Sequence, residues 1–377
     1  MTGRLCGLGG PAPAGYRAKM ILAARLTVLG SLNMDIAVSV PALPAPGETV
    51  LGGAAMVAPG GKGANQAVAA ARLGRSAGLA VRMVGCVGDD DFGRALRAAL
   101  HAEGVDDSAV RTVPGMPTGI AMITVDAAGE NTITVAPGAN REVGPDDVAA
   151  ACNRSGVLVI SAEIPGPAIR TALASTGPAS TGSASTGPAS TGPASMGPDR
   201  TGPAAGERTI RLLNLAPAPP DAAELLAAGP DWLVVNESEA AAILGRPVAG
   251  LAEAARAAAD LVAAGAGSAV VTAGAAGAAY YGPRASPAGA DRPETGAEFA
   301  AVTVPGFRVR AVDSVGAGDT FTGALAVAVA AGVPPVEAVT AAAAAGATAA
   351  AKPGTQSGMP YPADILAVTG YSWPVTS

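Results

Sequence analysis

Residues 313–323, with the sequence DSVGAGDTFTG, place two glycines and a carboxylate at the start of an alanine-rich stretch. Gly316 and Gly318 permit a tight turn, and the amides that open the following helix converge on one point, a geometry that binds anions. Asp319 lies at this point, where it could accept a proton from a hydroxyl group while the amides hold a phosphoryl group. The alternative is that Asp319 only caps the helix.

A second glycine-rich segment, residues 59–67 (PGGKGANQA), also precedes a predicted helix. It is not a nucleotide-binding P-loop, because the lysine comes before the last glycine and no Ser or Thr follows it. Backbone that a ligand can approach closely, one cation and one amide side chain suit a ligand with many hydroxyl groups. The alternative is an ordinary glycine-rich turn.

Further polar and glycine residues follow the predicted strands. Ligands of an open α/β sheet bind at the carboxyl ends of its strands, so residues gathered there are better candidates than the same residues elsewhere. Each of them alone is more typical of a cap or a turn, but together they form a constellation. These residues are Asn33, Asp35, Glu163, Asn236, Glu239, Thr272, Gly274 and Gly277.

A sheet must position these residues, and the chain alternates short Val-rich runs with Ala-rich helical patterns. This alternation predicts a mostly parallel α/β sheet that is covered by helices on both faces. The predicted strands are residues 21–29, 81–87, 157–160, 210–215, 232–235 and 268–272, and the predicted helices include 65–73, 92–103 and 251–264.

Two regions, 35–56 and 119–135, interrupt this alternation with extended segments, turn residues and no helix. We expect them to pair as a small antiparallel sheet beside the main sheet; the alternative is that they add edge strands to it.

Three segments are rich in Gly, Pro and Ala and lack any periodic apolar pattern. Residues 1–19 are predicted to be a disordered extension, and 283–297 a surface insertion. Residues 175–204 repeat a five-residue unit, STGPA and its variants, which predicts a flexible surface loop because it can bury almost nothing.

Composition excludes several classes of protein. The net charge is -6, with 24 basic and 30 acidic residues and no basic block, so a nucleic-acid partner is not expected. One histidine and three scattered cysteines leave no Ser-His-Asp triad, histidine-rich metal site or disulfide framework. The longest uncharged stretch, 261–283, is mostly Ala and Gly and is interpreted as a helix end, a loop and a strand. We therefore expect a cytoplasmic protein without a membrane partner.

In their order along the chain, these motifs resemble those of the ribokinase (PfkB) family of carbohydrate kinases. The similarity covers about residues 21–362, apart from the two insertions. It implies a three-layer α/β/α core with a small β-sheet lid built from 35–56 and 119–135, all within one kinase domain over 20–377. The motifs are GSLNMD (30–35), PGET (46–49), GGKGANQ (60–66), GAN (138–140), NLAP (214–217), NESE (236–239) and residues 313–321.

The resemblance also implies roles for single residues. Asp319 would be the base that accepts the proton of the sugar hydroxyl, and the backbone amides of Gly316, Ala317 and Gly318 would hold the transferred phosphoryl group. The sugar would be bound by Asn33, Asp35, Gly61, Lys62, Asn65 and Glu163. ATP would be bound by Asn236, Thr272, Gly274, Gly277 and Gly318, and Mg²⁺ by Glu239 through water.

Members of this family also bind a monovalent cation, usually K⁺, behind the phosphoryl site. The matching positions act mostly through backbone carbonyls and are Asp313, Val315, Ala349, Lys352 and Gly354. At one further position the serine of the family falls on Gly358, while the hydroxyl here is on Ser357.

The activity that the resemblance implies is phosphorylation of D-ribose by ATP at the 5-hydroxyl, in a homodimer that pairs through the lid. Other acceptors within the family are fructose, 2-keto-3-deoxygluconate, a sugar phosphate or a nucleoside. The alternative from another class is a catalytically silent sugar-binding or regulatory protein.

Overall fold

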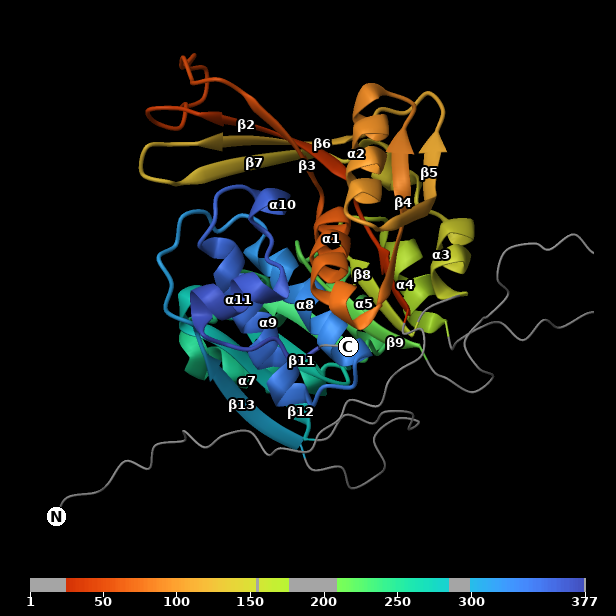
Figure 1. Cartoon of the computed structure of the whole chain (residues 1–377), viewed down its shortest axis with the longest axis vertical. Helices are drawn as coiled ribbons and strands as arrows, with labels where there is room; N and C mark the ends of the chain where they lie inside the picture. The colour runs from red at the N-terminus through yellow and green to blue at the C-terminus, as the bar shows by residue number, and fades with distance from the viewer. Residues whose placement is uncertain (1–24, 154–155, 176–208, 285–298, 376–377) are drawn as a thin grey trace, which may run out of the picture.

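The computed structural model describes residues 25–153, 156–175, 209–284 and 299–375 (Figure 1). The segments 1–19, 175–204 and 283–297 lie almost entirely outside these residues, as do residues 21–24 of the first predicted strand. What was expected of those segments stays a prediction.

The main sheet, within the described residues, has nine strands in the order β13-β12-β11-β10-β9-β8-β1-β4-β5. Every pairing from β11 to β5 is parallel, and β12 and β13 continue the sheet through antiparallel pairings. All five residues of β8 (VLVIS) are buried, as expected for a parallel strand with helices on both sides. The predicted mostly parallel sheet is confirmed. Its strands are β1 (Arg25–Leu29), β4 (Ala80–Gly88), β5 (Asp106–Val113), β8 (Val157–Ser161), β9 (Ile210–Asn214), β10 (Trp232–Asn236), β11 (Ala269–Thr272), β12 (Gly277–Pro283) and β13 (Phe299–Pro305).

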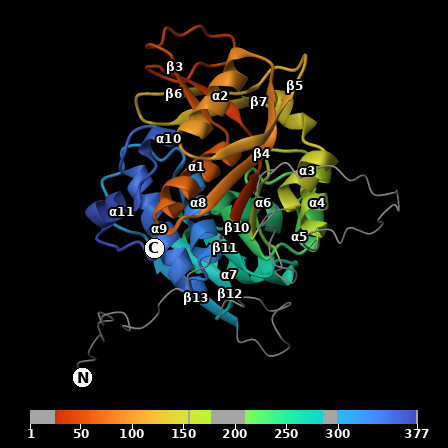
Figure 2. The same cartoon turned by 45° about the vertical axis from the view of Figure 1, so that its right-hand side comes forward.

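Helices cover both faces of the main sheet and complete three layers (Figure 2). One face carries α1 (Lys62–Gly74), α2 (Asp91–Ala102), α8 (Ala317–Ala330), α9 (Pro335–Ala350) and α11 (Pro362–Thr369). The other carries α3 (Pro145–Cys152), α4 (Gly166–Ala174), α5 (Ala222–Ala227), α6 (Glu237–Leu244) and α7 (Gly250–Ala263). Short helical turns are α10 (Thr355–Gly358), η1 (Arg75–Ala77), η2 (Gly138–Glu142) and η3 (Gly274–Ala276).

A separate small sheet, here named the lid sheet, has the strand order β3-β2-β6-β7. It consists of β2 (Asn33–Ser39), β3 (Met56–Gly60), β6 (Gly119–Val125) and β7 (Asn131–Ala136), and it projects from the layered body in Figure 1. The two interrupting regions therefore contribute to a separate sheet and add no edge strands to the main one, although β3 begins only at Met56, where the first predicted region ends.

The expected antiparallel pairing of the lid sheet is only partly correct, because its central pair, β2 with β6, is parallel. The reason lies in the main sheet. β2 follows β1 and β6 follows β5, and β1 and β5 both run parallel to β4, so the chain enters the lid twice in the same direction.

Small residues let α1 and α8 pack closely. A Cβ on Gly323 of α8 would lie 2.7 Å from the backbone oxygen of Gln66 in α1 and 2.9 Å from the Cβ of Ala69. Side chains one turn earlier on α8 therefore lie directly against α1.

None of the helices in the described parts of the chain combines the length and apolar character needed to span a membrane. Residues 261–283 form the end of α7, the strand β11, the turn η3 and the strand β12, much as expected. The cytoplasmic location stays a prediction.

Candidate active site

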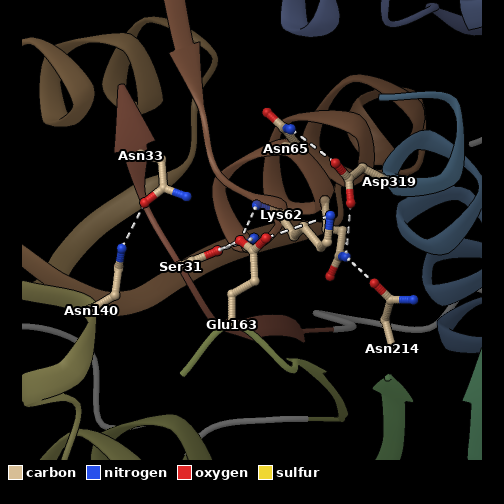
Figure 3. Close-up of polar contacts among 10 residues, drawn as sticks. Ser31, Asn33, Lys62, Asn65, Asn140, Glu163, Asn214 and Asp319 are labelled. Carbon is tan, nitrogen blue, oxygen red and sulfur yellow. Dashed lines mark hydrogen bonds and ion pairs between the residues drawn. The ribbon is translucent and has the colours of Figure 1, made fainter. Parts of the chain in front are cut away.

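The carboxylate of Asp319, in the first turn of α8, points at α1 (Figure 3). Its Oδ2 accepts a hydrogen bond from Asn65 Nδ2 at 2.9 Å, and its Oδ1 accepts one from Gln66 Nε2 at 3.1 Å. Both donors belong to α1, so capping of its own helix does not describe this carboxylate. A carboxylate has about four lone-pair sites, so capacity remains for a further donor such as a hydroxyl group.

The surroundings of Asp319 favour proton acceptance. Burial raises the pKa of Asp319, while the positive charge of Lys62 and the hydrogen bonds from Asn65 and Gln66 oppose this effect, and the net direction is upward. A carboxylate with a raised pKa is a stronger base, which suits the removal of a proton from a hydroxyl group.

The backbone at the start of α8 is open beside Asp319. Gly316 precedes the helix with φ of 77°, a left-handed conformation that glycine adopts without strain. A Cβ on Gly318 would meet no atom within 4 Å, and both glycines line the pocket that contains Asp319. The amide of Ala317, by contrast, donates to the carbonyl of Ser314 at 3.2 Å. The start of α8 is therefore a candidate anion site, in which Gly316 and Gly318 line the pocket.

Lys62, the first residue of α1, forms an ion pair with Glu163, with 3.5 Å between Nζ and Oε1. The other carboxylate oxygen, Oε2, accepts a hydrogen bond from Ser31 Oγ at 2.6 Å. Burial lowers the pKa of Lys62, but the charges of Asp319, Glu163 and Glu239 outweigh this effect and raise it overall. Lys62 therefore carries a positive charge between carboxylates (Figure 3).

Asn33 opens the lid sheet and is fixed by Asn140. Its Oδ1 accepts a hydrogen bond from Asn140 Nδ2 at 2.8 Å, and Asn140 also bonds the amide and carbonyl of Leu32 at 2.9 and 3.0 Å. Because Oδ1 is hydrogen-bonded to Asn140, the amide nitrogen of Asn33 is the atom turned towards Lys62 (Figure 3). A Cβ on Gly119 would lie 2.2 Å from this oxygen, so only glycine fits there.

Asp35 lies two residues further along β2, against Gly60. A Cβ on Gly60 would lie 2.1 Å from Asp35 Oδ2. Burial, with a smaller contribution from the charges of Glu163 and Asp319, raises the pKa of Asp35 to about 7, although Lys62 opposes this shift. The charged sugar-binding candidates, Asp35, Lys62 and Glu163, therefore interact electrostatically with one another.

A pocket beside Asp319 extends over the carboxyl ends of β9, β10 and β11. Asn236 and Glu239 line it and also form the capping box of α6, with both hydrogen bonds at 2.8 Å. Burial raises the pKa of Glu239. The full lining is Lys62, Asn214, Ala216, Val234, Val235, Asn236, Glu239, Thr272, Gly316, Gly318 and Asp319.

Gly274 and Gly277 are not among the residues that line this pocket. Gly277 has φ of 116°, and a Cβ there would lie 2.0 Å from the carbonyl oxygen of Val304, so strand packing explains its glycine. Gly274 has φ of 51° and open space around it, at the start of η3.

The loop at 313–315 lies against the loop at 349–354. The two carboxylate oxygens of Asp313 accept hydrogen bonds from the amides of Val315 and Gly354, both at 3.0 Å. The carbonyl of Ala349 accepts from the amide of Lys352 at 3.0 Å. Ser357 Oγ donates to the carbonyl of Pro353 at 3.2 Å. The structure therefore brings together all five expected positions.

The model of the pfkB family carbohydrate kinases matches residues 23–179 and 203–362 of this chain. The chain belongs to this family. A ribokinase from Schizosaccharomyces pombe is 33% identical over 319 residues, 82% of this chain and 86% of that protein. A ribokinase from Haemophilus influenzae is 48% identical over 115 residues, which are 30% of this chain and 36% of that protein. The kinase is thus an ATP-dependent sugar kinase.

Solved structures of two ribokinases have the same fold as this kinase. The structure from Thermotoga maritima is 29% identical, with a TM-score of 0.70 over 91% of this chain and 98% of that one. The Arabidopsis thaliana ribokinase, complexed with ribose and ATP, is 27% identical, with a TM-score of 0.69 over 93% of this chain and 100% of that one.

Five polar residues of the kinase site were not predicted from the sequence. Gln66, Asn140 and Asn214 lie within motifs that the sequence analysis quoted, so their place beside glycines and acidic residues was an available signal. Ser31 also lies within a quoted motif, GSLNMD, whereas Gln356 in α10 lies outside every quoted motif and carried no signal. What joins all five is that each hydrogen-bonds a predicted residue, or Gln66 in the case of Asn214.

Proposed function

We propose that the kinase phosphorylates the 5-hydroxyl of D-ribose with ATP and uses Asp319 as the base. The observation that carries this proposal is the pocket in which Asp319, Lys62 and the start of α8 meet. The choice of ribose is supported by the ribokinases from S. pombe and T. maritima and by the ribose and ATP complex of the A. thaliana ribokinase.

In the proposed reaction, the sugar oxygen forms a bond to the γ-phosphorus of ATP, and the bond from that phosphorus to the leaving oxygen of ADP breaks. Asp319 accepts the proton that the hydroxyl group loses. The amides at Gly316 and Gly318 and the charge of Lys62 stabilise the negative charge on the phosphoryl oxygens. Positioning and charge stabilisation then account for most of the catalysis.

The sugar would lie between the lid sheet and α1, because the residues proposed to bind it come from both. Their carboxylates and amide oxygens accept hydrogen bonds from sugar hydroxyls, and their amide groups and ammonium donate to them. The proposed set is Asn33, Asp35, Gly61, Lys62, Asn65 and Glu163, of which Lys62 and Glu163 already pair with each other.

ATP would be held at the carboxyl ends of β10 and β11 by Asn236 and Thr272, with Gly274 and Gly277 beyond the pocket and Gly318 at the phosphates. No three His, Cys, Asp or Glu side chains gather into a metal-binding group in the described residues. Glu239 nevertheless lines the pocket, and a carboxylate oxygen there suits contact with Mg²⁺ through water. When bound, Mg²⁺ neutralises phosphate charge.

A monovalent cation fits the donor set of the two loops at 313–315 and 349–354. Asp313 ties these loops together by hydrogen bonds to both. The backbone carbonyls of Val315, Ala349, Lys352 and Gly354 are oxygen donors of the kind that K⁺ prefers. When bound, K⁺ would add positive charge close to the start of α8.

The lid sheet would cover the bound sugar and exclude water, which would otherwise compete as the phosphoryl acceptor. We also propose that two copies of the kinase pair through their lid sheets. Apolar side chains exposed on both faces of the lid sheet support this proposal, because exposed apolar residues gather at interaction sites. The exposed fractions are 68% for Met56, 56% for Val57, 60% for Met122, 51% for Ile133 and 42% for Val135.

The test is an ADP-release assay with Mg-ATP and a panel of acceptors, with and without K⁺. The panel contains D-ribose, 2-deoxy-D-ribose, fructose, 2-keto-3-deoxygluconate, a sugar phosphate and a nucleoside. The deoxy sugar is included because a deoxyribokinase from Salmonella typhi is 30% identical over 304 residues. We expect the highest kcat/KM with D-ribose and stimulation by K⁺.

The variant that tests the role of the base is Asp319→Asn, which keeps the size of the side chain and removes the carboxylate. We expect kcat to fall by about 10²–10⁴-fold, the usual contribution of a general base, with little change in ATP binding. Near-normal turnover by Asp319→Asn would show that Asp319 is not the base. Activity only with another panel member would reassign the substrate, and activity with none would favour a silent sugar-binding protein.

A further inference from the structure

Gln66 is a buried amide on α1 that contacts the proposed base and has no role in the reaction described above. We propose that Gln66 is a positioning residue, oriented by Asn214, that fixes the Asp319 carboxylate for proton acceptance. This inference rests on the proposed function, because it concerns how the same base is held. Three observations support it.

The first observation is a chain of hydrogen bonds in which each donor and each acceptor can be assigned in only one way. The carbonyl oxygen of Val234 in β10 can only accept, and it accepts from Asn214 Nδ2 at 3.1 Å. The Oδ1 of Asn214 must therefore face Gln66, and it accepts from Gln66 Nε2 at 2.9 Å. The same nitrogen donates its other hydrogen to Asp319 Oδ1 at 3.1 Å. A backbone group of the main sheet thus sets the orientation of the amide that holds the base.

The second observation is the oxygen of the same amide. Gln66 Oε1 is buried and has no hydrogen-bond partner among the described residues. A buried oxygen without a hydrogen-bond donor lowers the stability of the folded protein. Rotating the amide by 180° would not relieve this cost, because it would place that oxygen against two other oxygens, Asp319 Oδ1 and Asn214 Oδ1. In the folded protein, Gln66 Oε1 therefore stays without a donor, while both hydrogens of Gln66 Nε2 are donated, one to Asn214 and one to Asp319.

The third observation is that the other carboxylate oxygen of Asp319 is held in a similar way. Asn65 Nδ2 donates to Oδ2 at 2.9 Å, and Asn65 Oδ1 accepts from Gln356 Nε2 at 3.1 Å. Each oxygen is thus held by an amide that a second amide orients. A carboxylate clamped at both oxygens cannot rotate freely, and pre-organisation of this kind is what a base needs before a hydroxyl group arrives.

The experiment measures the titration of the Asp319 carboxyl group by ¹³C NMR of protein labelled at aspartate side chains. The Asp319 resonance is identified by its absence in Asp319→Asn. The compared proteins are the wild type, Gln66→Met, Asn214→Leu and their double variant. Thr340→Val is the matched control, because it also replaces a helical polar side chain, one that donates to the carbonyl of Val336 within α9. The charged groups that face Asp319 are Asp35, Lys62, Glu163 and Glu239, and all stay unchanged.

We expect Gln66→Met to move the titration midpoint of Asp319 upward by about one pH unit, which is tenfold in the acid dissociation constant, since a donor to the ionised form is lost. Asn214→Leu should move it in the same direction by less, because Gln66 is then less well oriented. The double variant should match Gln66→Met, and Thr340→Val should not move the midpoint. In the D-ribose assay, the acidic limb of kcat/KM should move with the midpoint, and kcat should fall more than KM changes.

An unchanged Asp319 midpoint in Gln66→Met would overturn the inference, as would additive effects in the double variant. A lower thermal stability with an unmoved midpoint would show that Gln66 serves only the packing of α1. If the wild type phosphorylates no sugar, the proposed function fails, while the NMR titration still decides whether Gln66 and Asn214 act on Asp319.

Discussion

At the residue scale, the ionisation of Asp35 beside Lys62 affects the stability of the fold, and we propose that it also affects sugar binding. The kinase buries Asp35 close to Glu163 and Asp319, and its pKa is raised from 3.8 to about 7. The folded protein therefore binds this proton more tightly than the unfolded chain does. The buried charge destabilises the fold fully above about pH 7, and its effect fades as the pH falls towards 3.8.

Asp35→Asn should therefore raise the free energy of unfolding by roughly 3 kcal/mol at pH 8.5, with a smaller gain at pH 5. The same variant should weaken sugar binding at pH 8.5 and raise the KM for D-ribose about tenfold or more, because it loses an ionised acceptor. Urea unfolding at both pH values and steady-state kinetics check these outcomes. Asp91→Asn is the control, since the side chain of Asp91 is 96% exposed. A stability gain that is equal at both pH values would contradict this origin.

The sequence indicates which side chains could do chemistry, and their roles stay predictions, whereas their hydrogen-bond partners could not be predicted. Asp319 and Lys62 stand out because they lie beside glycines, and Glu163 stands out because it follows a predicted strand. The hydrogen bond between Gln66 and Asn214 spans 148 positions of the chain, and no local pattern indicates such a pair. An amide side chain has many possible partners, so its role becomes visible only when the fold brings distant segments together.

At the scale of elements, the start of α8 both begins a helix and borders the proposed phosphate site. A substitution at Gly318 can disturb phosphate binding without destabilising the helix. Gly318 lies in the first turn, where alanine favours a helix more than glycine does. A Cβ there would meet no protein atom within 4 Å, but it would project into space beside Asp319 where the phosphates are proposed to bind.

Gly318→Ala should leave the free energy of unfolding unchanged or raise it by up to about 1 kcal/mol. The kcat/KM for ATP should nevertheless fall at least tenfold, because the methyl group obstructs the anion site. Gly53→Ala is the control, because a Cβ at Gly53 would lie 3.8 Å from Ser39 O in an exposed loop away from the pocket. Thermal unfolding and ATP kinetics on both variants provide the check. Unaltered ATP kinetics would argue against phosphate binding at this helix start.

Element boundaries agree with the sequence patterns to within a few residues, whereas packing between elements could not be predicted. The glycine at position 323 could equally mark a weak point of the helix, and only the fold shows that it allows α1 to approach α8. Similarly, turn residues indicated extended segments in the lid. The parallel pairing of β2 with β6, however, depends on the direction in which the preceding strands β1 and β5 run in the main sheet. Both features arise from contacts between residues far apart in the chain.

At the scale of the whole molecule, alternating strand and helix patterns were enough to predict three layers and a parallel sheet. The order of strands was not predictable, because each Val-rich run resembles the others. β1 lies between β8 and β4, so the chain first builds one side of the sheet and then the other. The ends of β9, β10 and β11 consequently lie on the opposite side of β1 from β4 and β5. This arrangement places Asn236 and Thr272, which are proposed to bind ATP, apart from the lid strands β2 and β6.

The register of the lid sheet separates its exposed apolar residues into two faces. Asp35 is opposite Ala121, which is opposite Val135, and Ile133 lies two residues before Val135 on the same face. Met122 is opposite Ile36 and lies on the other face. If two kinase copies pair over the face that carries Asp35, each lid would also help to enclose the sugar.

Ile133→Glu should convert the proposed dimer to a monomer, because it would bury an unpaired charge in the interface. Met122→Glu is the matched control on the opposite face and should leave the dimer intact. Sedimentation velocity at micromolar concentration distinguishes the two species. Dissociation by Met122→Glu alone would place the interface on the other face, and a monomeric wild type would refute pairing through the lid. Because an open lid admits water, Ile133→Glu should also raise the ratio of ATP hydrolysis to sugar phosphorylation.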